Sequence, residues 1–235
     1  MLFGGFDGGG VRKDTLVLCD GTWSALEPSG SHPAPRALHA SCTVRNRVVI
    51  HGGWGGGTRL LADLWILSID VSAGFRWRHV VPPDEHLMPS ARQGHSAIAC
   101  GDSEVLLFGG DTGGMLSNEL WSWQSHGGRW AQLQPSGEAP SPRTAHVAGL
   151  LHPSDLADKR GCALHGGFLV IYGGRDPKDR CLADVFLFSL VENCWSAPQL
   201  AGDVPRPVCS AASCGLGECL LVDGGRDDDG WVGHL

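Results

Sequence analysis

The stretch HGGWGGGTRLLADLWILSIDVSAGFRW, residues 51–77, holds a Gly-Gly pair followed by a tryptophan 24 residues after the second glycine. The same pair recurs along the chain, and in three other copies the tryptophan follows after 18 to 21 residues. The copies are Gly4-Gly5 to Trp23, Gly52-Gly53 to Trp77, Gly109-Gly110 to Trp130 and Gly173-Gly174 to Trp195, with a fifth pair at Gly224-Gly225. The first glycines are 48, 57, 64 and 51 residues apart, and this spacing indicates a repeat architecture.

Each repeat contains four strand signals in a fixed order. An apolar run such as Val48-Val49-Ile50 precedes the Gly-Gly pair, and an apolar–aromatic pair such as Leu64-Trp65 follows it. The late tryptophan marks another strand, and a further strand follows the Pro-x-Arg-x-x-His motif that opens most repeats. The apolar runs lack polar alternation, which is typical of strands covered on both faces. Four short antiparallel strands in roughly 50 residues are typical of one blade of a β-propeller.

The glycines and late tryptophans of three repeats are predicted to be structural. Glycine allows a positive φ at a strand end and a close approach of neighbouring backbone. Tryptophan supplies a large apolar surface between adjacent blades. These residues are Gly52, Gly53, Trp77, Gly109, Gly110, Trp130, Gly173, Gly174 and Trp195.

The repeats resemble the Kelch family, in the version whose units carry Pro-x-Arg-x-x-His ahead of the first strand. The matching segments are residues 33–39, 89–95 and 140–146. The resemblance covers nearly the whole chain and implies an all-β fold, a β-propeller of four-stranded antiparallel Kelch blades in a single domain. The expected units span residues 1–26, 36–82, 92–134, 143–198 and 206–235. In the last unit, Arg206 and Cys209 are expected at the places of the arginine and the histidine.

Both terminal units are shorter than the others. We expect three complete central blades between an incomplete first blade and an incomplete last blade, in a propeller that is truncated at both ends. The parent propeller is expected to have six or seven blades. The alternative is that the chain closes as a four-bladed propeller, which would leave the strand at 220–222 without a place.

The composition argues against several classes of function. The net charge is −7 without a basic stripe, so nucleic acid is not expected as a partner. No apolar stretch is long enough for a membrane helix, and the first residues do not resemble a signal peptide. The nine cysteines are scattered without a Cys-x-x-Cys motif, which indicates free thiols in a reducing compartment. We therefore expect a protein of the cytoplasm or nucleus that is not secreted and has no membrane partner.

No cofactor, metal or catalytic residue is expected. Kelch-like copper oxidases hold copper with tyrosine and histidine, whereas this chain has one tyrosine, Tyr172, in a strand position. The run Asp227-Asp228-Asp229-Gly230 lacks the later acidic ligand of a calcium loop. The sequence therefore does not indicate an enzyme.

Four arginines are expected just before strand one of their units: Arg36, Arg92, Arg143 and Arg206. Strand one of a propeller blade lies nearest the axis, so these arginines would form an arc around one mouth of the central channel. In one interpretation, they bind carboxylates of an acidic partner loop or an anionic ligand. In the other, each arginine and its histidine tie one blade to the loop of the next, and recurrence in every unit favours this structural role.

Loop residues that do not repeat are better candidates for binding. The loops after strand two and after strand four of each blade share one side of a propeller, here called the loop face. Exposed tryptophan, methionine and arginine are enriched in the cores of protein interfaces. The candidate partner-binding residues on this face are Trp54, Arg59, Asp111, Met115, Arg175, Asp176 and Arg180. Trp54 is the most prominent of them because the glycines around it would leave it uncovered.

The sequence thus predicts a non-enzymatic protein-binding module, a Kelch-type adaptor or scaffold that holds a partner protein on its loop face. The alternative is the propeller part of an enzyme or enzyme accessory, since related Kelch propellers occur in iron-dependent specifier proteins and beside RNA-modifying methyltransferase domains. Iron would need Glu, Asp and His together on the loop face, whereas Asp155, Asp158 and His165 lie in an insertion expected on the opposite face. The identity of the partner and the oligomeric state stay open.

Overall fold

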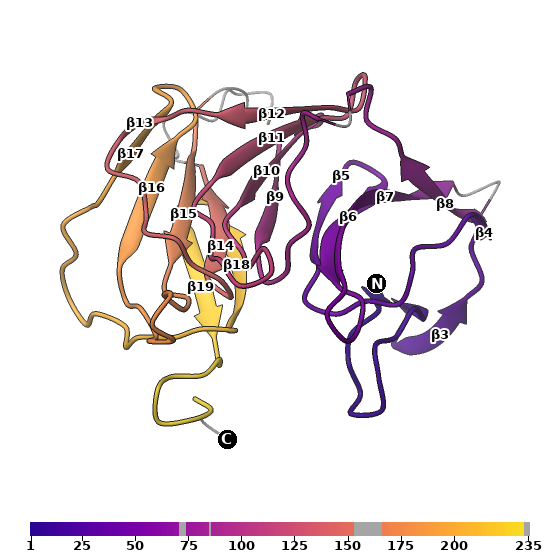
Figure 1. The fold of residues 1–235 in the computed structure, drawn as a ribbon, viewed down its shortest axis with the longest axis horizontal. Helices are drawn as coiled ribbons and strands as arrows, with labels where there is room; N and C mark the ends of the chain where they lie inside the picture. The colour runs from indigo at the N-terminus through magenta and orange to yellow at the C-terminus, as the bar shows by residue number, and fades with distance from the viewer. Residues whose placement is uncertain (71–73, 85, 153–165, 233–235) are drawn as a thin grey trace.

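The computed structural model of the chain describes residues 1–70, 74–84, 86–152 and 166–232 (Figure 1). In these ranges the chain forms β-sheets and no α-helix, which confirms the predicted all-β fold. A helix long and apolar enough to cross a membrane is accordingly absent from the same ranges. The insertion residues Asp155, Asp158 and His165 lie outside the described part.

The strands form five sheets that follow one another along the chain. The first sheet contains β1 (Leu2–Phe3), β2 (Thr15–Cys19) and β3 (Thr22–Leu26). The second contains β5 (Ala40–Val44), β6 (Arg47–Trp54), β7 (Leu60–Asp70) and β8 (Gly74–Val80). The third contains β9 (Ser96–Cys100), β10 (Glu104–Phe108), β11 (Leu120–Gln124) and β12 (Arg129–Leu133). The fourth contains β14 (Val147–Leu151), β15 (Phe168–Tyr172), β16 (Val185–Ser189) and β17 (Cys194–Ser196), and the fifth β18 (Ala212–Leu216) and β19 (Cys219–Asp223). Successive strands of these sheets pair antiparallel.

Two short segments add an outer strand that the sequence did not predict. β4 (Ser29–Gly30) pairs in parallel with β8, and β13 (Ser136–Gly137) pairs in parallel with β17. Each segment belongs to the linker that leaves the preceding sheet, so the linker ties the outer edges of two sheets together. Each segment is the Ser-Gly end of a Pro-Ser-Gly tripeptide, at residues 28–30 and 135–137. The repetition of this tripeptide is the sequence feature from which the two outer strands could have been predicted.

The sheets are arranged side by side, with their first strands next to one another (Figure 1). β5 contacts β9, β9 contacts β14 and β14 contacts β18. The turn before each inner strand donates one hydrogen bond to the turn of the previous sheet: Gly94 N–H to Leu38 O at 2.9 Å, Ala145 N–H to Gly94 O at 2.7 Å, and Ser210 N–H to Ala145 O at 2.8 Å. This is the inner side of the predicted propeller arrangement.

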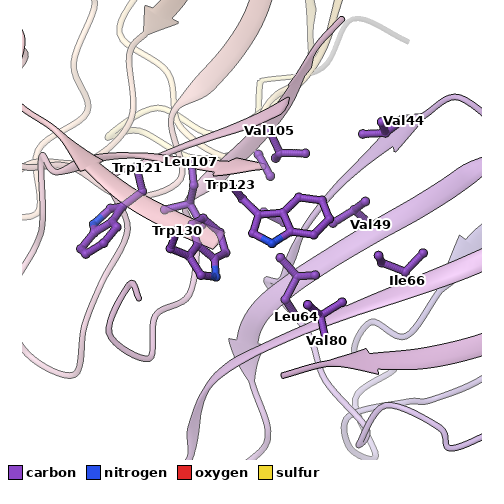
Figure 2. Close-up of a cluster of buried hydrophobic side chains, with 12 residues drawn as sticks. Val44, Val49, Leu64, Ile66, Val80, Val105, Leu107, Trp121, Trp123 and Trp130 are labelled. Atoms are coloured by element: carbon purple, nitrogen blue, oxygen red, sulfur yellow. The ribbon is translucent and has the colours of Figure 1, made fainter. Parts of the chain in front are cut away.

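Apolar cores lie between consecutive sheets. Alternate residues of β6 face opposite neighbours, because Val49 packs toward the third sheet and Ile50 toward the first. Figure 2 shows Trp123 and Trp130 of the third sheet beside Val49 and other side chains of the second. The central sheets are therefore covered on both faces, as their unbroken apolar runs predict.

The late tryptophans of three sheets pack against the sheet before them. Each tryptophan ring contacts a residue of the preceding sheet, the one directly before the Gly-Gly pair of that preceding sheet. The ring centroids are 5.1 Å apart for Trp77 and Phe3, 5.3 Å for Trp130 and His51, and 5.4 Å for Trp195 and Phe108. These tryptophans are buried, whereas Trp23 of the first sheet is 55% exposed.

Candidate functional site

The Gly-Gly pairs form the junctions between sheets. Gly53 N–H donates to Arg92 O over 2.8 Å, and Gly110 N–H donates to Arg143 O over 2.9 Å. The φ angles of Gly52 and Gly53 are 63° and 105°, and a β-carbon on Gly52 would lie 2.8 Å from Arg92 O. Only glycine meets both requirements at this point.

Three motif arginines are buried within their own sheets. The side chains of Arg36, Arg92 and Arg143 are 0% exposed. Each guanidinium donates to the carbonyl of the first glycine of its own unit and to a carboxylate. These partners are Gly52 and Asp63 for Arg36, Gly109 and Glu119 for Arg92, and Gly173 and Asp184 for Arg143. The side chain therefore joins the end of strand two to the start of strand three in one sheet.

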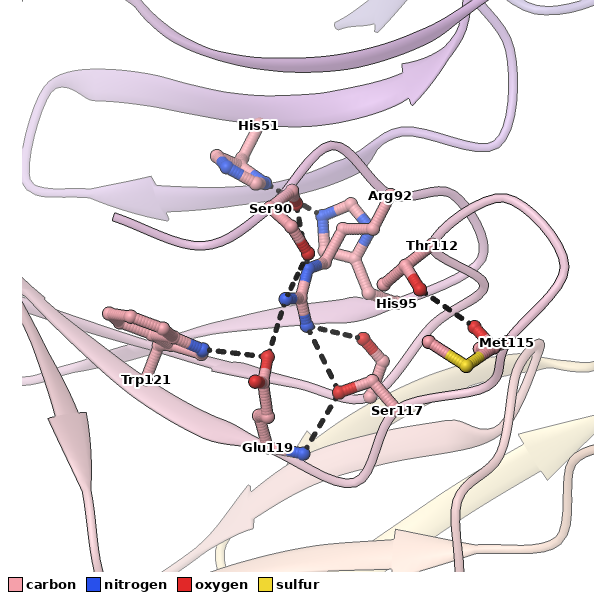
Figure 3. A network of polar contacts seen from close by, with 10 residues as sticks. His51, Ser90, Arg92, His95, Thr112, Met115, Ser117, Glu119 and Trp121 are labelled. Atoms are coloured by element: carbon pink, nitrogen blue, oxygen red, sulfur yellow. Dashed lines mark hydrogen bonds and ion pairs between the residues drawn. The ribbon is translucent and has the colours of Figure 1, made fainter. Parts of the chain in front are cut away.

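Figure 3 shows the fullest of these networks, around Arg92. Its Nη2 donates to Glu119 Oε2 over 2.6 Å and to Ser90 Oγ over 3.1 Å, while Nε donates to the Ser90 carbonyl. Every guanidinium nitrogen of the three buried arginines has an acceptor of this kind. With side chains that are 0% exposed and an acceptor at every guanidinium nitrogen, these arginines have little to offer a partner, and their geometry supports the structural interpretation. The arginine side chains do not reach the next sheet, contrary to the expectation. The links between sheets come from the backbone and from the motif histidines, His95 to His51 and His146 to Ser96.

The fifth unit has Val208 where the other units have the buried arginine. Val208 O accepts a hydrogen bond from Gly174 N–H over 2.8 Å, as Arg143 O does from Gly110. Ser210, two residues later, has a φ of 55°, and Ala145 in the equivalent turn has a φ of 54°. The backbone therefore sets the register of this unit.

This register corrects two sequence expectations. Arg206 lies outside the arginine row, its side chain is 61% exposed, and its nearest carboxylate oxygen is Asp227 Oδ2 at 3.6 Å. The place of the motif histidine is taken by Ala211 and not by Cys209. The arginine in Arg206-Pro207-Val208-Cys209 suggested a match two residues too early, because the side chains resemble the motif and the backbone turn leaves no mark in the sequence.

The sequence also missed the acidic partners of the arginines. Asp63, Glu119 and Asp184 each stand directly before the apolar–aromatic pair of strand three, and this recurrence was the signal. Trp65 Nε1–H donates to Asp63 Oδ2 over 2.6 Å, and Trp121 Nε1–H donates to Glu119 Oε2 over 3.1 Å. Although burial acts in the opposite direction, these hydrogen bonds and those from the arginines hold the pKa of Asp63 and Glu119 below the usual range.

Histidines line the same junctions in a neutral form. His51 Nδ1 and His95 Nε2 lie 3.0 Å apart, and His146 Nε2 lies 2.9 Å from Ser96 Oγ. Burial is the main cause that lowers the pKa of His39 to about 4, of His51 and His146 to about 3, and of His95 well below 6.5. Nearby positive charges add to this effect. These side chains are packing groups, not bases poised to take a proton at neutral pH.

A hollow of about 540 Å³ opens on the loop face between the third and fourth sheets. Four of the predicted partner-binding residues are in its wall: Asp111, Met115, Arg175 and Asp176. They come from the loop after β10 and the loop after β15, which lie next to each other because the third and fourth sheets are adjacent. The wall also includes Gly114, Leu116, Pro142, Thr144, Pro177 and Asp179, which the sequence did not single out.

Met115 and Arg175 are exposed to different degrees in this wall, and the Arg175 side chain is 20% exposed. Met115 is 75% exposed. Arg175 Nη1 lies 2.5 Å from Asp179 Oδ1, which is itself mostly exposed, and Arg175 Nε is buried without a hydrogen-bond partner. An apolar, adaptable side chain and a guanidinium therefore lie on the same wall.

Asp111, Asp176 and Arg180 are occupied in shaping the loops. Asp111 Oδ1 accepts hydrogen bonds from the backbone N–H groups of residues 113 and 114. Asp176 accepts backbone hydrogen bonds in the same manner and holds Arg180 by an ion pair of 2.6 Å. Arg180 is not in the wall of the hollow. These three residues position the loops, and Met115 is exposed on the loop that Asp111 shapes.

Trp54 and Arg59 lie on the neighbouring β6–β7 hairpin. Trp54 is half-buried, since its ring centroid is 5.9 Å from that of Phe6 and its Nε1–H donates to Gly57 O over 2.8 Å. The expectation that little would cover Trp54 is therefore wrong, because Phe6 of the first sheet reaches it. Phe6 is 57% exposed, so the pair forms an aromatic patch, and Arg59 is exposed on the same hairpin.

Among the residues that the structure describes, no group of three His, Cys, Asp or Glu side chains could hold a metal ion. The loop face instead combines the hollow with the aromatic patch of Phe6 and Trp54. The two regions adjoin, since a β-carbon on Gly113 would lie 3.6 Å from Leu60 Cδ1 of the β6–β7 hairpin. This arrangement is suited to contact with another molecule.

Residues 1–157 match a family model described as the KLHDC2/KLHL20/DRC7 Kelch-repeats domain. Adagio protein 3 of Arabidopsis thaliana is 27% identical over 250 aligned positions, which cover 99% of this chain and 38% of that protein. The F-box/kelch-repeat protein At1g51550 of the same plant is 32% identical over 197 positions, covering 75% of this chain and 38% of that protein. Serine/threonine-protein phosphatase BSL2, also from Arabidopsis thaliana, is 30% identical over 166 positions, which cover 70% of this chain and 15% of that protein. The chain thus spans 38% or less of the length of each of these relatives.

Proposed function

This chain belongs to the Kelch-repeat family, whose repeat domains are protein-interaction modules, and we propose from this premise that it is a non-enzymatic adaptor or scaffold. Its partner protein docks on the loop face. The observation that supports this assignment is the hollow of about 540 Å³, in which four independently predicted residues meet. A cavity of this size is in the range of known binding sites, which is about 300–1,000 Å³.

The chemistry of the hollow favours a protein segment as its occupant. Met115 and the prolines of the wall offer apolar contacts, and Arg175 and Thr144 offer polar ones. Methionine, arginine and aromatic residues are enriched in the cores of protein interfaces. We therefore expect a partner that inserts one apolar side chain into the hollow and covers the Phe6–Trp54 patch with a second contact.

The second candidate is that the chain is the propeller part of an enzyme or enzyme accessory. One relative is a serine/threonine-protein phosphatase, of which this chain covers 15%. Binding would be the contribution of this chain in that case too, because the histidines at the sheet junctions are neutral and Asp63, Glu119 and Asp184 are paired with buried arginines. We place the activity in the cytoplasm or nucleus, with neither nucleic acid nor membrane as partner.

The proposal is tested by affinity capture with matched variants, followed by calorimetry with the purified partner. Met115→Asp places a charge in the hollow, and Val191→Asp places one in the β16–β17 turn on the opposite face, where Val191 is 67% exposed. We expect the partner to be retained by the parent chain and by Val191→Asp and lost by Met115→Asp, with equal melting temperatures for all three. Met115→Ala and Arg175→Ala should each weaken binding about fivefold or more, which is the effect of the minority of interface residues that dominate the binding energy. Loss of binding in Val191→Asp alone would move the site to the other face.

A further inference from the structure

The interface between the fourth and fifth sheets carries two thiols near its loop-face end. Cys181 ends the loop after β15, where it pairs with Arg175 in an isolated bridge. Cys209 precedes β18 and pairs in the same way with Arg226. The two residues are 7% and 2% exposed, and both are free thiols.

Backbone and side-chain contacts hold these two cysteines next to each other. Val208 N–H, one residue before Cys209, donates over 3.0 Å to the carbonyl of Leu182, one residue after Cys181. The Cys181 thiol donates to Arg226 O over 3.5 Å, and Cys209 N–H donates to the same oxygen over 2.8 Å. The Cys209 thiol is a neighbour that helps to raise the pKa of the Cys181 thiol. The two thiols therefore lie close together at the boundary of two sheets.

This pair is absent from the repeat pattern. At the boundary of the third and fourth sheets, the residues at the same places are Leu116 and Thr144, which form the equivalent bridges. Leucine and threonine thus satisfy the packing of this position in another unit. The residues at these two places differ at each interface, being Val11 and Ala37 at the first and Leu60 and Gln93 at the second. Among the described interfaces, the one between the fourth and fifth sheets is where both are cysteines, so two thiols meet there.

The surroundings decide which thiol reacts first. Arg175 contacts the Cys181 thiol, and its positive charge favours the thiolate there. Burial has the larger, opposite effect and raises the pKa of Cys181 to about 11. Because Cys181 is the more exposed of the two and lies beside the guanidinium, an oxidant meets it before Cys209, at the slow rate of a mostly protonated thiol.

We propose that Cys181 and Cys209 are an oxidation site, which a peroxide converts to a disulfide across the fourth and fifth sheets. The Cys181 sulfur attacks one oxygen of hydrogen peroxide, the O–O bond breaks, and a sulfenic acid and one water form. The Cys209 sulfur then attacks the Cys181 sulfur, the S–O bond breaks, and the second water leaves as the S–S bond forms. Two thiols are oxidised and one peroxide is reduced to two waters, and a dithiol reductant reverses the change.

The disulfide would fasten the loop after β15, which forms one wall of the hollow, to the fifth sheet. It would also restrict the unfolded chain between residues 181 and 209. A crosslink of this type stabilises mainly through the unfolded state, and for a chain of this length we expect a rise in Tm of about 5–10 °C.

The site is tested on the 235-residue chain by mass spectrometry after peroxide treatment and alkylation. Trypsin is unsuitable, because Arg206 is followed by Pro207 and both cysteines stay in one peptide, 181–226. A protease that cuts after Asp and Glu separates them into peptides 180–184 and 204–218. We expect these two peptides to be disulfide-linked after oxidation and separate after dithiothreitol.

Peptide 204–218 also contains Cys214, which is exposed, so variants assign the link. Cys209→Thr introduces the residue that the preceding unit has at this place, and Cys181→Leu does the same for the other thiol. Both variants should lose the link and the rise in Tm, and Cys214→Ser should retain both. If either variant does not fold, the other variant and Cys214→Ser still show whether the link joins Cys181 to Cys209. A link that persists in Cys209→Thr, or Cys181 and Cys209 that stay alkylatable once Cys214 is fully oxidised, would overturn the proposal.

Discussion

At the residue scale, the fold depends on a charged group that is buried inside each of the three central sheets. Arg143 is fully buried, and its guanidinium binds Asp184 at 2.6 and 2.9 Å and the Gly173 carbonyl at 3.0 Å. It also lies over the Phe186 ring, 5.5 Å from its centroid. Burial of a charge is costly unless such partners replace water. The arginine therefore stabilises the end of strand two only as long as its whole set of acceptors is present.

We expect Arg143→Ala to destabilise the chain strongly and Arg206→Ala to have little effect. The first change leaves Asp184 and a buried carbonyl without their donor, which costs about 2–4 kcal/mol. The second removes an exposed side chain with one distant carboxylate, for which about 0.5 kcal/mol or less is typical. Denaturation in urea measures both. Equal losses in the two variants would contradict the register that places Val208, and not Arg206, in the row.

The residue scale also shows where sequence reasoning stops. Repeated side chains such as Gly52 and Trp130 could be recognised because each unit needs the same conformation or the same volume. The turn before each inner strand recurs as well, but its positive φ is adopted by Leu38, Gly94, Ala145 and Ser210, which share no side chain. Hydrogen bonds from the neighbouring sheet impose this turn, so a local pattern could not reveal it, and the last unit was misaligned.

At the scale of elements, the sheets are stable because each fills its neighbour's surface. In the core between the second and third sheets, Trp130 is 7% exposed and lies against His51 across the boundary. β12, which carries Trp130, is the outermost strand of its sheet, so this ring covers the second sheet from the edge. Removal of such a side chain leaves a cavity that neither sheet can close alone.

Trp130→Ala should therefore lower the free energy of unfolding by about 3–5 kcal/mol. The matched control is Trp23→Ala, at the equivalent place in the first sheet, where the ring is 55% exposed. Trp23→Ala should lower the free energy of unfolding by about 1 kcal/mol or less, because little apolar contact disappears. Chemical denaturation followed by circular dichroism measures both, and an unchanged midpoint for Trp130→Ala would mean that this ring does not hold the two sheets together.

The elements of the candidate site could be predicted only in part. The alternation of strand directions puts the loops after strands two and four on one face, so Met115 and Arg175 could be chosen from the sequence. Which loops meet depends on how one sheet sits against the next. For the same reason, the contact of Phe6 with Trp54 and the proximity of Cys181 to Cys209 could not be predicted. Both are contacts between units, and the strand pattern within one unit carries no information about them.

At the scale of the whole molecule, the first sheet and the C-terminal region from β19 onward carry several exposed apolar side chains. Leu221 is 55% exposed, Val222 40% and Trp231 81%, and Leu2, Leu18 and Trp23 are exposed to similar degrees. β19 has a pairing partner on one side, β18. Exposed apolar surface and unpaired strand edges favour association between chains.

We expect the 235-residue chain to self-associate with rising concentration. Leu221→Lys should reduce the association, because it places a charge on the exposed strand without removing a buried contact. Size-exclusion chromatography with light scattering measures the mass of both forms. A parent chain that stays monomeric over the whole accessible concentration range would show that these regions do not associate.

The dependence of stability on pH is a property of the whole molecule, because the neutral histidines lie at successive boundaries between sheets. The pKa values of His39, His51 and His146 are about 4, 3 and 3, and that of His95 is well below 6.5. In the unfolded chain these groups titrate near 6.5. Between pH 6.5 and about 4 the unfolded state therefore binds more protons than the native state.

It follows that the free energy of unfolding is insensitive to these groups above about pH 7 and falls as the pH drops below 6.5. Each histidine should cost on the order of 1–2 kcal/mol by pH 5. His51→Phe tests the cause, because Phe108 occupies the same place in the third sheet and packs against His146 at 5.2 Å, edge to face, as His51 does against His95 at 5.0 Å. In the variant, one proton fewer is taken up on unfolding. The slope of the unfolding free energy against pH should therefore be smaller by about 1.4 kcal/mol per pH unit between pH 6 and 4.5. Urea denaturation at a series of pH values measures the slope, and the same slope in parent and variant would show that acid acts on the chain through other groups.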